Sequence, residues 1–150
     1  MVYLSGLNLN GNADGASYGV TVQGQSTVYI VHCTIQGFYQ SGVLVDSVGG
    51  PARVVIKDSI IVNNDNGVYV NPSGAASAAI ILNSVIDGNT VSAAGGSGAD
   101  GASAISLMQT LLTGSPTGLG LQNGASAVLV GPSNAIAGAI SGTTTSVPFK

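Results

Sequence analysis

A repeat of about 25 residues runs through the chain and restricts its fold more than any other feature of the sequence. The pattern of residues 28–37 returns in four further copies, at residues 2–11, 54–63, 79–88 and 105–114. One copy of this length is too short to bury an apolar face by itself. Repeats of this kind therefore stack on one another, and the stacked copies share one continuous core.

Three columns of equivalent positions carry the repeat. The first column is apolar and holds Leu4, Ile30, Ile56, Ile81 and Leu107. The second is mostly small and holds Leu7, Cys33, Ser59, Ser84 and Thr110. The third is apolar again and holds Leu9, Ile35, Ile61, Ile86 and Leu112. Because the first column advances by 26, 26, 25 and 26 residues, we expect like residues to form ladders inside a stack, with the small column at an inward corner.

A sixth copy is degraded. We assign to its three columns Val130, Ser133 and Ile136. One extra residue precedes the last of these positions, and we interpret it as a bulge.

Each copy also predicts a sharp turn and a further strand. Two residues after the third column only glycine or asparagine occurs, namely Gly11, Gly37, Asn63, Gly88, Gly114 and Gly138. These two residue types adopt a positive φ most readily, so each copy is expected to turn in the same way. A second alternating strand follows in most copies, at residues 19–22, 42–45, 67–70 and 118–121. Each copy therefore holds about three short strands.

These patterns predict an all-β fold: a right-handed parallel β-helix, or solenoid, of about six coils with a repeat of about 25 residues. The 23 glycines and the scarcity of strong helix formers agree with short strands and many turns. The turns vary in length, which favours the right-handed form, as does the right-handed rule for parallel crossovers. We expect residues 1–150 to form a single domain without an N-terminal cap, because Val2 begins a strand at once.

The chain resembles the right-handed parallel β-helix repeat family, the pectate-lyase-like superfamily. The resemblance rests on the apolar-x-apolar-x-x-small-x-apolar-x-Gly/Asn runs and on the Gly-Val-x-Val strands. Asn12, Asn64 and Asn89 also resemble the asparagine ladder at one turn of that family, which is interrupted here by Phe38, Ser115 and Ala139. The resemblance implies the fold, whereas function has to be argued from the site, because this scaffold hosts lyases, hydrolases, epimerases, phage tailspikes and adhesins.

The strongest candidate site is a polar column that points outward. The residues just before the second column are Gly6, His32, Asp58, Asn83 and Gln109. One interpretation is a saccharide-binding strip that includes the outward Tyr29, or an acid–base pair of His32 and Asp58 with Lys57 beside it. The other interpretation is that an exposed strand face must be polar, and that opposite charges on adjacent strands add a little stability. Tyr3 and Tyr29 fall in one outward column. They could form a platform for a sugar ring or a simple cross-strand pair.

No catalytic set of the resembled family maps onto the chain. Its pectate lyases use clustered aspartates for calcium with an arginine base, and its polygalacturonases use paired aspartates on adjacent coils. Here the only arginine is Arg53, and no two of the six aspartates share a column in adjacent coils. We therefore predict no catalytic residue, no metal site and no cofactor.

Residues 95–103 match a calcium-binding nonapeptide. Calcium would need tandem copies, so we interpret this single copy as a loop leaving the stack.

Composition limits the partners. The three bases are Arg53, Lys57 and Lys150, and they cannot build the basic face that nucleic acid requires. No apolar run is long enough to span a membrane, and residues 1–4 lack the basic and apolar regions of a signal peptide. Cys33 is the only cysteine, so no intramolecular disulfide forms. The compartment stays open, although an extracellular or cell-surface location is expected if the chain belongs to a longer precursor.

These observations favour a non-enzymatic β-helix module with a structural or surface-interaction role, as part of a larger extracellular bacterial protein. The alternative is a carbohydrate-binding or polysaccharide-cleaving module that uses the outward polar column. Expected partners are a polysaccharide, a protein, or a second copy that pairs with the open ends of the β-helix. Residues 146–150 are expected to cap the last coil, with Pro148 blocking strand addition, so their deletion should increase self-association.

Overall fold

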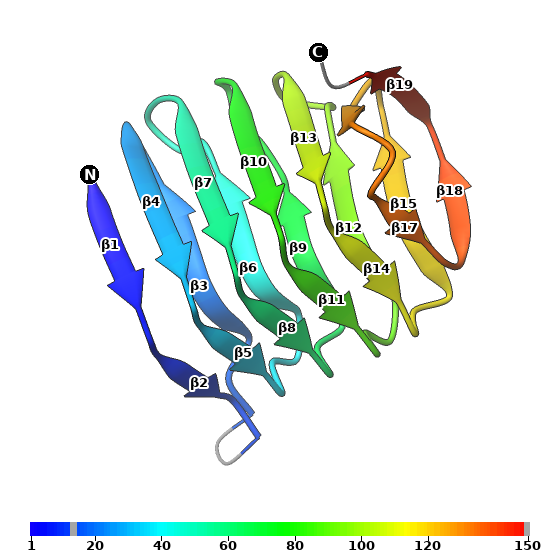
Figure 1. Cartoon of the computed structure of the whole chain (residues 1–150). Coiled ribbons are helices and arrows are strands. Elements are labelled where there is room, and N and C mark those ends of the chain that lie inside the picture. The colour runs from blue at the N-terminus through cyan, green and yellow to red at the C-terminus, as the bar shows by residue number, and fades with distance from the viewer. Residues whose placement is uncertain (13–14, 149–150) are drawn as a thin grey trace.

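The chain winds into a parallel β-helix of three sheets (Figure 1). The computed structural model describes residues 1–12 and 15–148, and these residues form strands and turns without a helix. Each coil contributes one strand to each sheet, and every strand pairs in parallel with the equivalent strand of the next coil. The predicted fold class is therefore confirmed.

The first sheet, sheet A, has seven strands. They are β1 (Val2–Ser5), β4 (Ser26–Val31), β7 (Ala52–Lys57), β10 (Ser77–Leu82), β13 (Ser103–Met108), β16 (Ser126–Val130) and β19 (Thr143–Val147). The first predicted column lies on this sheet in the predicted register, because Ile56 pairs with both Ile30 and Ile81.

Sheets B and C have six strands each. Sheet B holds the third column on very short strands: β2 (Asn8–Asn10), β5 (Thr34–Gln36), β8 (Ile60–Val62), β11 (Val85–Asp87), β14 (Leu111–Thr113) and β17 (Ala135–Ile136). Sheet C holds the predicted second strands: β3 (Tyr18–Gln23), β6 (Ser41–Asp46), β9 (Asn66–Val70), β12 (Ser92–Ser97), β15 (Thr117–Gln122) and β18 (Ala139–Ser141).

The core is a narrow apolar column between the three sheets. Isoleucine, leucine and valine side chains of the inner coils are fully buried there, including Ile30, Ile56, Ile61, Ile81, Ile86, Leu107 and Leu112. They alternate along each strand with outward residues, as the two-residue period of a strand requires. In the first coil the core positions are more open, and Leu7 of the second column is exposed.

The small second column closes the corner between sheets A and B through side-chain hydrogen bonds. The Ser59 hydroxyl accepts from the Cys33 backbone N–H (3.1 Å) and donates to the Lys57 carbonyl (2.8 Å). The Ser84 hydroxyl repeats this pattern with Ser59 N–H (3.2 Å) and the Leu82 carbonyl (2.7 Å). Because backbone groups turned inward have no water to bond, this column supplies the partners that the sheets cannot.

A short asparagine ladder closes the corner between sheets B and C. The Asn89 side-chain oxygen accepts from the backbone N–H and the side-chain amide of Asn64, at 3.0 and 3.1 Å. Asn64 in turn accepts from the Phe38 N–H (3.0 Å), and the Ser115 hydroxyl accepts from the Asn89 N–H (3.1 Å). The interruption is thus partial: Ser115 supplies an acceptor in place of an amide, whereas Phe38 ends the ladder and leaves Asn12 exposed outside it.

The glycine and asparagine turn column is confirmed at five of its six positions. Gly37, Asn63, Gly88, Gly114 and Gly138 all have positive φ. Gly11 does not, and it is needed for space instead: a Cβ there would lie 2.5 Å from the ring of Phe38.

The register assigned to the sixth copy was wrong in two columns. Leu129, not Val130, pairs with Leu107, and the Asn134 side chain, not Ser133, accepts from the Thr110 N–H (3.1 Å). Ile136 pairs with Leu112 as predicted. The additional residues lie in the turn before Asn134, where Gly131 has a φ of 73°. An amide oxygen can replace the hydroxyl at this corner. We assigned Ser133 because the second column holds small residues, and so missed Asn134.

The interpretation of residues 95–103 as a loop was also partly wrong. Gly95, Gly96 and Ser97 complete strand β12, which is buried along its whole length. Residues 98–102 form the turn before β13, and even there Asp100 pairs in parallel with Ser73 of the neighbouring coil. The strand was missed because its inward positions hold alanine and glycine, which give no apolar alternation.

At the other end of the stack, Ser146 and Val147 belong to β19, which adds a last strand to sheet A. These two residues extend sheet A by one strand. A cap would instead cover the open end of the stack. Residues 149–150 lie outside the described residues. Within the described residues no helix is long and apolar enough to cross a membrane.

Neighbouring isoleucines on β8 test the core assignment. Ile61 is fully buried, whereas Ile60 on the same strand is 47% exposed. We expect Ile61→Ala to lower the free energy of unfolding by about 2–5 kcal/mol, because a cavity replaces buried methyl groups. Ile60→Ala should lower it by about 0.5 kcal/mol. The free energies of unfolding are measured by urea denaturation. Equal losses in the two variants would contradict the inward position of the third column.

Candidate functional site

The outward polar column is a column of left-handed turns. Its five members have φ values between 45° and 66°: Gly6, His32, Asp58, Asn83 and Gln109. This conformation is unfavourable for most side chains and is adopted most readily by glycine, asparagine and aspartate. The polar character of the column therefore has a backbone cause that is independent of any ligand.

The same column continues the backbone pairing between coils. The His32 N–H donates to the Lys57 carbonyl (3.1 Å), the Asp58 N–H to the Leu82 carbonyl (3.2 Å) and the Asn83 N–H to the Met108 carbonyl (2.9 Å). Each turn residue is thereby held above the next, and the column's side chains all leave the stack on the outer side.

Asp58 is the centre of the only side-chain cluster in this column. The Asn83 amide donates to one carboxylate oxygen at 2.5 Å. His32 Nε2 and Lys57 Nζ lie 3.5 and 3.6 Å from the other oxygen. The structure thus brings together His32, Asp58 and Asn83 from three coils, as the sequence predicted.

The cluster stabilises the ionised carboxylate. The hydrogen bond from Asn83 is the largest cause that holds the pKa of Asp58 below its usual value of 3.8, and the charges of Lys57 and His32 add to it. Desolvation acts in the opposite direction and is outweighed. A carboxyl with a lowered pKa carries no proton to donate near neutral pH, so Asp58 is poorly suited to act as a general acid.

The other predicted residues stand apart from this cluster. Gln109 occupies the next turn, with an exposed side chain that has no hydrogen-bond partner within the described part of the chain. Tyr29 lies on the outer face of sheet A and stacks on Tyr3, with ring centroids 4.5 Å apart and an angle of 10° between the rings. This geometry is that of a cross-strand aromatic pair.

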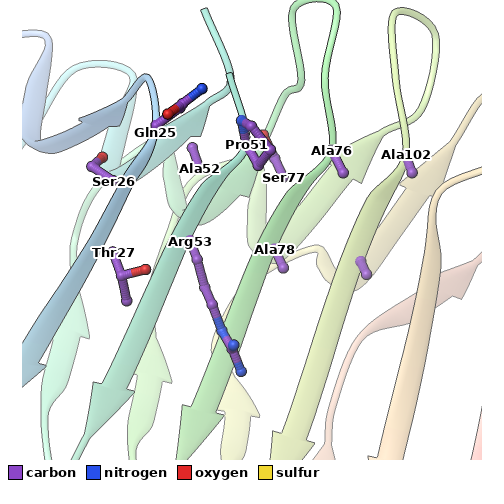
Figure 2. Close-up of a pocket in the computed structure, with 11 residues that line it drawn as sticks. Gln25, Ser26, Thr27, Pro51, Ala52, Arg53, Ala76, Ser77, Ala78 and Ala102 are labelled. Carbon is purple, nitrogen blue, oxygen red and sulfur yellow. The ribbon is translucent and has the colours of Figure 1, made fainter. Parts of the chain in front are cut away.

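Sheet A also carries a broad hollow that the sequence did not reveal (Figure 2). It has a volume of about 590 Å³ and lies over the starts of β4, β7, β10 and β13. Small residues such as Ala78 and Ala104 line it. Arg53 extends along the outer face of the sheet. Arg53 forms no ion pair within the residues that the structure describes.

Two further hollows lie next to each other on the outer face of sheet C. Their volumes are about 310 and 250 Å³, and both are lined by Asn66 and Tyr69. Sequence reasoning missed them because their residues come from several coils and share no motif. The available signal was the column that follows Tyr69, where Gly95 and Gly120 replace larger side chains.

No three histidine, cysteine or acidic side chains gather into a metal-binding group within residues 1–12 and 15–148. Asp14 and Lys150 fall outside those residues. Cys33 is buried in the corner column, where its thiol approaches the carbonyls of Leu4 and Val31. It packs as a small side chain, as predicted.

The low pKa of Asp58 predicts a specific dependence of stability on pH. Because its pKa is lower in the folded chain, the carboxylate contributes stability that is fully present above about pH 3.8 and is lost as the pH falls through the folded value. The difference in free energy of unfolding between wild type and Asp58→Asn should therefore shrink as the pH is lowered through this range. The NMR-detected pKa of Asp58 should rise in Asn83→Ala, and an unchanged value would contradict the assigned hydrogen bond.

A left-handed turn at Gln109 predicts an unusual order of stabilities. Gln109→Val should lower the free energy of unfolding by about 1–2 kcal/mol, because a β-branched side chain is strained at a φ of 50°. Gln109→Gly should match or exceed the wild type, because glycine adopts this φ without strain. Thermal and urea unfolding of both variants would check this order. A more stable valine variant would contradict the turn geometry.

The fold and its repeats agree with a known family. The family described as right handed beta helix region matches residues 2–131. No curated protein and no solved structure matches the chain significantly. The family match includes the five regular copies of the repeat, and its handedness is the one that the turn lengths predicted. The chain therefore belongs to the right-handed β-helix family.

Proposed function

We propose that this β-helix is a non-enzymatic module with a structural or surface-interaction role, a rigid scaffold that offers its outer sheet faces to a partner. The observation that carries this proposal is the state of Asp58. Its carboxylate is held between Asn83, Lys57 and His32, which leaves it ionised and already hydrogen-bonded. A general acid needs a proton to donate, and a general base needs an accessible oxygen to accept one. Asp58 is ionised near neutral pH, and both of its carboxylate oxygens already have partners.

The backbone supports the same proposal. The polar side chains stand at positive φ, so turn geometry accounts for their type without a catalytic role. Backbone pairing from coil to coil, together with the hydroxyl and asparagine columns at the corners, holds the three faces in a fixed arrangement. Rigid faces of this kind suit binding, because little conformational freedom is lost when a partner docks.

A second candidate function is a saccharide-binding or saccharide-cleaving strip along the outward polar column of His32, Asp58, Asn83 and Gln109. It is favoured by the exposure of His32, Asn83 and Gln109, which leaves polar groups in reach of solvent on three of the four coils that carry the polar column. The strip would bind through these side chains and through the face of Tyr29.

Polysaccharide assays distinguish the two candidates. We expect the wild-type protein to leave both acidic and neutral polysaccharides at their original chain length, measured by size-exclusion chromatography after prolonged incubation. Asp58→Asn is the matched control, because it keeps the shape of the side chain and removes its charge. Shortening of any polymer by the wild type that disappears in Asp58→Asn would overturn the non-enzymatic proposal. If the wild-type protein is retained on an immobilised polysaccharide and Asp58→Ala is not, the saccharide-binding strip would be favoured.

A further inference from the structure

The chain contains three Asn–Gly pairs, and the fold places them in different surroundings. They are Asn10–Gly11 at the end of β2, Asn66–Gly67 on β9 and Asn123–Gly124 in the turn between β15 and β16. Asparagine is one of the thermolabile residues, and a following glycine has no side chain to shield its backbone nitrogen. The surroundings of each pair therefore decide whether it can react.

The reaction in question is loss of the asparagine amide. The glycine nitrogen attacks Cγ of the asparagine and forms an N–Cγ bond, the Cγ–Nδ2 bond breaks, and the former amide nitrogen leaves as ammonia with the proton of the glycine N–H. Water then opens the cyclic imide at either carbonyl, which yields aspartate or isoaspartate. The balance is one water consumed and one ammonia released. Because the peptide unit between the two residues has to turn its nitrogen toward Cγ, the reaction requires a free N–H and space around the glycine.

Gly11 fails both requirements. Its N–H donates to the Gln36 carbonyl at 2.9 Å. It is buried, and a Cβ there would lie 2.5 Å from the Phe38 ring. The Asn10 side-chain oxygen accepts from the Asn12 N–H at 3.0 Å, which holds the amide in place.

Gly67 is packed more tightly still. It is buried on β9, and a Cβ there would lie 2.3 Å from Cγ2 of Ile86 and 2.4 Å from the Ala93 carbonyl oxygen. Strand β9 pairs with β6 on one side and with β12 on the other. The Ser92 hydroxyl donates to the Asn66 side-chain oxygen at 2.7 Å. Rotation of the peptide unit between Asn66 and Gly67 would therefore break strand pairing inside sheet C.

The turn at Asn123 and Gly124 lacks these restraints. Both residues are exposed and have positive φ, and a Cβ built on Gly124 would meet nothing within 4 Å. Within the part of the chain that the structure describes, the Gly124 N–H has no hydrogen-bond partner. The Ala125 N–H donates to the Gln122 carbonyl (3.0 Å), and this bond closes the turn. Opening the turn does not require the pairing of β15 or β16 to be broken.

The neighbouring coil also leaves room for the turn to move. Gly98 lies against it, and a Cβ there would lie 2.5 Å from the Asn123 carbonyl oxygen. The Asn123 side chain donates from Nδ2 to the Ser97 hydroxyl at 3.1 Å. This bond is made by the nitrogen that leaves, so the reaction has to break one side-chain hydrogen bond among the described residues.

We propose that Asn123 is a site of spontaneous deamidation in the folded protein, and that the fold protects Asn10 and Asn66 from the same reaction. The modification adds one negative charge. Where isoaspartate forms, it also lengthens the backbone of the turn between β15 and β16 by one methylene group. This inference goes beyond the proposed function, because neither Asn123 nor Gly124 belongs to the outward polar column.

The test is peptide mapping by mass spectrometry after incubation of the full chain at mildly alkaline pH and body temperature. Deamidation is measured as the mass increase that accompanies exchange of an NH2 group for an OH group. In the native protein we expect Asn123 to react at least about tenfold faster than Asn10 or Asn66, because those two react only after local opening of the stack. In the urea-unfolded chain the three rates should agree within about threefold, because no fold protects any of them.

Two variants check the assignment. Asn123→Gly removes the amide and keeps a residue that adopts positive φ without strain. The modification in the turn should disappear, while the thermal unfolding midpoint stays close to that of the wild type. Asn10→Gln is the matched control, because it removes a different Asn–Gly pair, and the rate at Asn123 should stay within about twofold of the wild type.

Two outcomes would overturn this inference. One is that Asn123 stays unmodified in the native protein while it reacts in the unfolded chain, which would show that the turn is protected as well. The other is that Asn10 or Asn66 reacts as fast as Asn123 in the native protein. Neither outcome bears on the non-enzymatic role, which is tested by the polysaccharide assays.

Discussion

Parallel backbone pairing between equivalent residues of successive coils is the constraint on which the rest of this structure depends. It places Ile56 between Ile30 and Ile81, and it does the same for every regular column. Once like residues lie above one another, an apolar position becomes an apolar ladder and a polar position becomes a polar strip. Core, corners and faces are all consequences of this one repeated pairing.

The corners show how the pairing is completed where strands end. At the corner between sheets A and B, outward residues take a positive φ, and the inward hydroxyls of Ser59 and Ser84 each accept a backbone N–H from the preceding coil. At the corner between sheets B and C, the Asn64–Asn89 pair performs the same task with amide groups. Asn134 combines both solutions in the last coil, since its amide serves the hydroxyl corner. A corner therefore requires a side chain that places a hydrogen-bond acceptor next to the backbone N–H. Serine and asparagine both meet this requirement.

This arrangement changes how polar residues on the surface should be interpreted. His32, Asp58, Asn83 and Gln109 formed the strongest candidate site in the sequence, yet the left-handed backbone conformation accounts for the residue types at His32, Asp58 and Asn83. Asn66 and Tyr69, which line both hollows on sheet C, lie on strand β9 and do not share this left-handed conformation. Polar and aromatic side chains that the fold does not require are better evidence for a ligand than those that it does.

The sequence by itself determined the fold class, the register of five coils and the pairing of His32 with Asp58, because stacking turns a linear period directly into neighbours in space. It did not reveal strand β12, whose alanine and glycine residues lack alternation, or the sixth-coil register, where a longer turn displaces the pattern. Only the tertiary structure decided that His32, Asp58, Asn83 and Gln109 have positive φ, and that one hollow is lined by Tyr18, Gln40, Asn66 and Tyr69. Those facts depend on backbone torsions and on side-chain directions across several coils, and neither is encoded in the spacing of residues along the chain.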